Sequence, residues 1–128
     1  MTTTCERPAK AANERLGNSL AVNDLPSAKD HPPGEVPAIG TVGNMRLHGR
    51  NSAAWFDAKA GRDQRYDYLY GASEITELAG LARSIASDRD ENYVITNNHF
   101  SGKAVANALE LLAALGGKAP LAPVELIE

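Results

Sequence analysis

The stretch Tyr93-Val-Ile-Thr-Asn-Asn-His-Phe-Ser-Gly-Lys-Ala-Val-Ala-Asn107 decides the fold. Its first four residues form an apolar, β-branched run that is typical of a strand, and a helical pattern starts at Ser101. Between the two stand Asn97, Asn98 and His99. Because α/β proteins place their chemistry at the carboxyl ends of parallel strands, this pattern predicts a functional site at the end of this strand.

A second strand is predicted at Asn44–His48, where apolar and polar residues alternate and place Arg46 and His48 on the polar face. A short helix is expected within residues 52–59, followed by a polar loop at residues 61–67. The next apolar spacing predicts a helix that buries Ile75, Leu78, Ala79, Ala82, Ile85 and Ala86.

The helix after the quoted strand is expected to end at Gly116 and Gly117. Its predicted buried stripe consists of Ala104, Val105, Ala108, Leu111, Leu112 and Leu115. The order strand, helix, strand, helix favours parallel strands with a right-handed crossover. Since a parallel sheet is covered on both faces, two clear strands predict part of an α/β domain rather than a whole one.

Composition narrows the protein class. The chain has 128 residues, about one domain, and its net charge of -3 is too mild to favour nucleic acid or an acidic membrane surface. No apolar run reaches the roughly 18 residues of a membrane helix, and the amino terminus lacks the features of a signal peptide. The single Cys5 cannot form an internal disulfide. We therefore expect a soluble, cytoplasmic protein.

Residues 1–41 differ from the rest of the chain. They are rich in Pro, Ala, Asn, Lys and Glu and contain no aromatic residue. Such a segment cannot bury enough apolar surface to offset the entropy of ordering it. We expect a disordered or weakly structured extension over residues 1–41 and an α/β domain over residues 42–128.

Three blocks of sequence resemble a known family, the domain of unknown function 72 or YecE-like proteins. The blocks are His48-Gly49-Arg50-Asn51, residues 65–70 (Arg-Tyr-Asp-Tyr-Leu-Tyr), and Asn97-Asn98-His99 with the helix start at residues 102–108. The resemblance covers about Met45 to Leu115. It implies the C-terminal part of a TIM-barrel-like fold, from a family whose members are about twice this length. The family has no settled biochemical function, so the resemblance implies a fold and not a reaction.

In such a barrel the strand ends surround the mouth of the site. His48 and Arg50 would lie at one strand end, and Asn98 and His99 at another. An imidazole pair can exchange protons near neutral pH, and a guanidinium can hold a carboxylate or a phosphate. We hypothesise that these four residues are catalytic.

Four further residues are candidates for ligand binding: Arg46, Asp67, Tyr68 and Asn107. Asp67 could fix a histidine tautomer, and Tyr68 lies in a loop that could fold over the strand ends. Each candidate also has a structural interpretation, in which the imidazoles and amides bond to backbone, Arg46 forms an ion pair and the tyrosines pack. For Asn107, a bond to a neighbouring loop is the preferred interpretation.

Charge around the first strand suggests the ligand. Five basic residues between Arg46 and Arg65 stand against two acidic ones, a local excess of three positive charges. This pattern favours a small anionic or sugar-like ligand, or else a solvated loop. His48, His99 and Asp67 are acceptable metal ligands, but their spacing matches no metal motif, so no metal site is predicted and the cofactor is unknown. Neither nucleic acid nor a membrane is an expected partner.

Three functional interpretations remain open. The chain could be part of an enzyme, a module that holds a ligand or a nucleic-acid phosphate without turnover, or a truncated remnant without its pocket. For the remnant, exposed strand edges would drive self-association or recruit a partner chain that completes the sheet.

Overall fold

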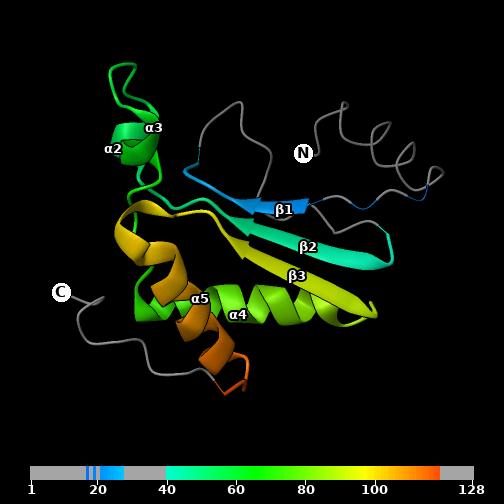
Figure 1. The fold of residues 1–128 in the computed structure, drawn as a ribbon. Helices are drawn as coiled ribbons and strands as arrows, with labels where there is room; N and C mark the ends of the chain where they lie inside the picture. Colours follow the sequence, from blue (N-terminus) through cyan, green and yellow to red (C-terminus); the bar gives the residue numbers. More distant parts are fainter. Residues whose placement is uncertain (1–16, 18, 20, 28–39, 119–128) are drawn as a thin grey trace.

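The computed structural model describes residues 17, 19, 21–27 and 40–118, and these form an α/β fold with three parallel strands (Figure 1). The strands are β1 (Ala21–Asp24), β2 (Val42–Leu47) and β3 (Glu91–Thr96), in the order β1-β2-β3. The elements between and after them are α2 (Ser52–Trp55), α3 (Arg62–Arg65), α4 (Ala72–Ala86), the 3-10 helix η1 (Phe100–Gly102) and α5 (Lys103–Ala114). The predicted α/β class and the parallel pairing of β2 with β3 are confirmed.

The register gives the sheet two different faces. Met45 pairs with both Val22 and Val94, and these residues share the face that packs against α4 and α5, which we call the helix face. Arg46 pairs with Asn23 and Ile95, and these point to the opposite side, which we call the open face.

Burial distinguishes the two faces. Met45 and Leu47 on the helix face are fully buried, in one apolar core with the inner side of α4. On the open face Tyr93 and Ile95 keep 54% and 40% of their surface exposed. Within the described residues, helices therefore cover only one side of the sheet.

Gly43 shows how closely α4 approaches the sheet. A Cβ at this position would lie 2.9 Å from the Ile85 Cγ2 atom of α4. The neighbouring Asn92 on β3 donates a hydrogen bond from Nδ2 to the Ala82 carbonyl of the same helix. The helix can rest on the strands at this end because glycine leaves the room for it.

Helix α4 matches its prediction closely. Ile75, Leu78, Ala79, Ala82 and Ile85 are buried as expected. At its start the Gly71 N–H donates to Glu74 Oε2 at 2.8 Å, which satisfies one of the free backbone donors of the first turn.

Helix α5 is rotated relative to its prediction. Ala104 and Leu111 are buried as expected, but Val105 and Leu112 are 57% and 43% exposed, and Ala108 and Leu115 are exposed as well. The expected apolar stripe is therefore wrong in part, because the polar Asn107 occupies the centre of the buried side, at 0% exposure. Its hydrogen bonds to the backbone of Tyr70 set the rotation of the helix.

Strand β1 corrects the expectation that order begins at residue 42. Val22 is part of the apolar core, and β1 pairs with β2 over all four of its residues. The sequence pattern missed this strand because four residues are too short to show an alternation. Most of residues 1–41, for which a disordered or weakly structured extension was expected, and Cys5 lie outside the described residues.

None of the helices in the described ranges is long and apolar enough to cross a membrane.

Candidate functional site

The carboxyl ends of the three strands meet at one rim, on the side where α2 and α3 lie (Figure 1). Asp24 ends β1, and its carbonyl accepts the His48 N–H at 2.9 Å just beyond β2. The Leu47 carbonyl accepts the Asn97 N–H at 2.6 Å just beyond β3. The backbone pairing thus continues past the strands and holds the residues that follow them side by side.

An imidazole–aromatic cluster, made of His48, Trp55, Tyr66 and His99, occupies this rim. The ring centroid of Tyr66 lies 5.9 Å from that of His48 and 5.3 Å from that of His99. Trp55 meets Tyr66 edge-on at 5.5 Å. The two histidines predicted to share a rim are therefore joined through one tyrosine ring, at the separations usual for aromatic pairs.

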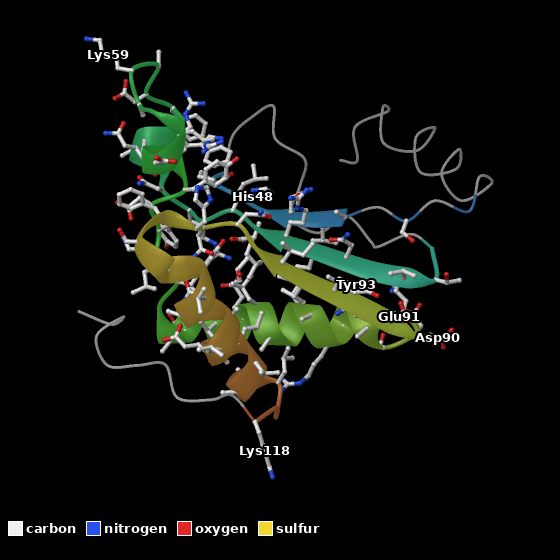
Figure 2. All side chains as sticks on the ribbon, in the orientation of Figure 1. His48, Lys59, Asp90, Glu91, Tyr93 and Lys118 are labelled. Carbon is white, nitrogen blue, oxygen red and sulfur yellow. The ribbon has the colours of Figure 1, made fainter. Side chains whose placement is uncertain are left out.

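His48 follows the last residue of β2 at the rim (Figure 2). Its Nε2 lies 3.3 Å from Asn23 Oδ1, so a hydrogen on Nε2 is donated to this amide oxygen. Its buried Nδ1 has no hydrogen-bond partner among the described residues. Burial, helped by the positive charge of Arg46 and opposed by Asp24, lowers the pKa of His48. The imidazole is therefore neutral at pH 7, with a free lone pair on Nδ1.

His99 lies at the outer end of the cluster, with half of its side chain exposed. Its Nδ1 is 3.0 Å from the Asn97 carbonyl, which makes Nδ1 the donor and leaves Nε2 for other contacts. Nε2 lies 3.7 Å from Asp63 Oδ1. The backbone thus orients this ring, and its second nitrogen is reachable from solvent.

Arg46 lies on the open face of β2, two residues before His48. Its Nε donates to Asn97 Oδ1 at 3.2 Å. Among the described residues no carboxylate lies within ion-pair distance of its guanidinium. This cation is therefore exposed and available to an anion at the rim.

Arg50 lies on the helix-face side of the rim and is already bound by carboxylates. Its guanidinium contacts Asp24 at 2.8 Å, Glu77 at 3.2 Å and Glu74 at 3.4 Å. The hydrogen bond to Asp24 is the main reason that the pKa of Arg50 is raised above its usual value. We call these four side chains the Arg50 network, and it ties the end of β1 to the first turns of α4.

Two tyrosines extend the Arg50 network. The Tyr70 hydroxyl donates to Asp24 at 2.7 Å and accepts the Gly49 N–H at 2.8 Å. The Tyr68 hydroxyl donates to Glu74 at 2.7 Å, and burial with this contact raises the pKa of Tyr68 to about 12. Tyr68, a predicted ligand contact, thus donates its proton to a protein carboxylate.

Gly49 fits between these tyrosines because it lacks a side chain. Its φ is +90°, and a Cβ there would lie 2.7 Å from the Cβ of Tyr68. The sharp turn at Gly49 directs the residues before and after it to different sides of the sheet. His48 lies on the open face, and Arg50 lies on the helix face.

The predicted amides Asn98 and Asn107 are both fully buried. Asn98 Nδ2 donates to the Tyr68 carbonyl and to Asn107 Oδ1, both at 2.8 Å. Asn107 accepts the Tyr70 N–H at 2.9 Å and donates to the Tyr70 carbonyl at 3.1 Å. These amides hold the 66–70 loop against α5, which matches the preferred structural interpretation of Asn107.

Asp67, the remaining candidate, forms an ion pair with Lys103 at the start of α5. Its carbonyl also accepts a hydrogen bond from Asn51 Nδ2 at 3.0 Å. In the described part of the chain, no three His, Cys, Asp or Glu side chains are placed to hold a metal ion together.

Sequence reasoning missed two residues of the rim, Asn23 and Trp55. Asn23 lies on the unrecognised strand β1, and nothing in its sequence context distinguishes it. Trp55 is the only tryptophan of the chain and follows the His48 block closely, which is the signal that could have identified it.

Comparison with known proteins gives a consistent result. A family profile described as "Protein of unknown function DUF72" matches residues 4–126. A solved DUF72 family protein from Thermotoga maritima is similar with a TM-score of 0.78 and 28% identity, over 85% of this chain and 41% of that chain. One from Enterococcus faecalis has a TM-score of 0.78 and 28% identity, over 91% of this chain and 44% of that chain. The chain thus spans less than half the length of these relatives. No curated protein matches it.

Proposed function

Because this chain belongs to the family of proteins of unknown function DUF72, we propose a function from the geometry of its own rim. We propose that the rim on the open face binds a small ligand that carries both an anionic group and a sugar-like ring. The observation that carries the proposal is the contact of the Tyr66 ring with the imidazoles of both His48 and His99.

The aromatic part of the rim suits the ring of the ligand. Tyr66 and Trp55 are both half-buried residues of this rim. Apolar ring faces pack against the C–H faces of a sugar, while Nε2 of the half-exposed His99 contacts its hydroxyl groups.

The anionic group is assigned to Arg46. Its exposed guanidinium, without a carboxylate partner in the described ranges, offers the forked donors that a phosphate or carboxylate prefers. Arg50 is left out of the ligand contacts because three carboxylates already surround it.

The two imidazoles can also handle protons. His48 is neutral and has a free lone pair on Nδ1, whereas His99 is fixed through Nδ1 and presents Nε2. We assign proton exchange with the ligand to His99 Nε2, since this side chain is half exposed and its other nitrogen contacts the backbone. Asn98 and Asn107 act as positioning residues through the 66–70 loop.

The test is calorimetric titration of the full chain with glucose 6-phosphate, glucose and inorganic phosphate. We expect glucose 6-phosphate to bind more tightly than either part alone, and its affinity to fall as salt is added. Arg46→Gln should weaken this binding about tenfold, because a charge-assisted contact is lost.

The matched control is Lys118→Gln, which also removes one positive charge. Lys118 lies far from His48, beyond the end of α5 (Figure 2). Equal losses in the two variants would mean that only the net charge matters. That result, or equal affinity for glucose 6-phosphate and free phosphate, would refute the proposal.

A further inference from the structure

We propose that Asn23 is the specificity-determining residue of the rim, because an amide at this position keeps His48 uncharged and leaves Arg46 unpaired. The inference rests on the proposed function, since it names the residue that sets the charge which an anionic ligand meets. An aspartate at the same position would give both cationic groups a partner within the protein, and the rim would no longer attract an anion.

The hydrogen bonds of Asn23 define which end of its amide faces the rim. Nδ2 donates to the Ala21 carbonyl at 3.3 Å, and a carbonyl oxygen can only accept. Oδ1 is therefore the atom that lies 3.3 Å from His48 Nε2. This oxygen needs a hydrogen on Nε2, so Asn23 holds His48 in one tautomer.

The charges around His48 explain why a neutral partner matters. Burial and the positive charge of Arg46 lower the pKa of His48, whereas Asp24 raises it. The Asp24 carboxylate is itself bound by the guanidinium of Arg50 at 2.8 Å. Tyr66, on the remaining side, contacts the imidazole with its ring. Because the amide partner adds no negative charge, a proton on this imidazole would be poorly compensated.

Arg46 is the direct neighbour of Asn23 in the sheet. The register pairs the two residues, and their side chains leave adjacent strands on the open face. Adjacent strands lie about 4.8 Å apart, so a carboxylate at position 23 would be within reach of the guanidinium. With an amide there, Arg46 has no carboxylate at ion-pair distance in the described part of the chain.

The alternation of β1 keeps the carboxylate of this strand away from Arg46. Asp24 pairs with Leu47 on the helix face, where its carboxylate belongs to the Arg50 network. Asn23 precedes it and lies on the open face. Asn23→Asp would therefore add a charge on the rim side of the strand with almost no change in side-chain shape.

The first measurement is an NMR pH titration of the His48 imidazole in the full chain without ligand. In Asn23→Asp, His48 should titrate about one pH unit higher than in the wild type, because a carboxylate beside Nε2 favours the imidazolium. In Asn23→Leu, the nitrogen signals of His48 should show a mixture of tautomers. A His48 that titrates alike in the wild type and Asn23→Asp, or keeps one tautomer in Asn23→Leu, would overturn the proposal.

The second measurement is calorimetric titration of the same proteins with glucose 6-phosphate at about pH 9, above the range in which histidine titrates. Asn23→Asp should bind about tenfold more weakly than the wild type, because the new carboxylate pairs with Arg46. Asn23→Leu should bind as the wild type does, since Arg46 stays unpaired. Equal losses in the two variants would show that the charge at position 23 is not what matters, and would refute the assignment.

Ser84→Glu is the control for an added negative charge. Ser84 is exposed on α4, which packs on the helix face of the sheet. This variant should leave both measurements unchanged, and a loss of affinity equal to that of Asn23→Asp would overturn the proposal. If the wild type itself does not bind glucose 6-phosphate, the proposed function fails, and the pH titration alone decides the role of Asn23.

Discussion

His48 is held neutral at the end of β2 by burial and by the positive charge of Arg46. Its Nε2 contact with Asn23 is the only hydrogen bond of the ring among the described residues. The neutral imidazole is therefore fixed through Nε2, and its Nδ1 is a buried acceptor without a partner in the described part of the chain. The burial and the contacts of His48 thus determine its protonation state and its hydrogen bonding at the rim.

The lowered pKa of His48 predicts how stability depends on pH. The unfolded chain binds a proton at this residue near its ordinary value of 6.5, while the folded chain does so only at lower pH. The free energy of unfolding therefore falls as the pH drops below 6.5, and this loss is absent above it.

The measurement is urea unfolding of the wild type and His48→Gln at about pH 7.5 and about pH 5.5. We expect the wild type to lose more stability between the two values than the variant, which has no imidazole to titrate at this position. Equal losses would show that the folded environment of His48 does not resist protonation.

Arg46 and Arg50 show what could be predicted at this scale. The alternation around Met45 placed Arg46 on the polar side of the strand, and the structure has it on the open face. The partners of Arg50 come from residues 24, 74 and 77, and only the folded chain brings these together. A local pattern can give the face of a strand residue, but it cannot give the charges that arrive from other elements.

The Arg50 network joins three elements, since it links the end of β1, the loop after β2 and the first turns of α4. Arg50→Leu would leave three carboxylates close together without their cation. We expect the free energy of unfolding to fall by about 2 kcal/mol, because charged hydrogen bonds are lost from a partly buried site.

Arg62→Leu is the matched control for Arg50→Leu. The Arg62 side chain is 81% exposed, and its pair with Asp63 spans 3.7 Å. Such a surface pair contributes less than about 0.5 kcal/mol. If both variants lost a similar free energy of unfolding in chemical denaturation, the structural role of the Arg50 network would be refuted.

Helix α4 and helix α5 differ in how well their faces could be predicted. For α4 the apolar spacing alone identified the buried side, because only apolar residues occupy it. For α5 two apolar sides flank the helix, and the choice between them depends on Asn107 and its bonds to Tyr70. The spacing of hydrophobic residues cannot predict that an amide is buried when its hydrogen-bond partner is backbone from a distant part of the chain.

At the scale of the whole molecule, the sequence predicted a partial α/β domain with parallel strands, and the structure and its relatives agree. Strand β1 escaped prediction because its four residues are ordered by pairing with β2, not by a pattern of their own.

The most direct test of the shared rim is an NMR titration of the imidazole signals with glucose 6-phosphate. The rings of His48 and His99 both contact the Tyr66 ring, with centroids 5.9 and 5.3 Å away. One ligand at this rim should therefore shift the signals of both histidines, with a single dissociation constant, and Tyr66→Ala should abolish the common response. Shifts at only one of the two, or two different dissociation constants, would contradict a single site at the strand ends.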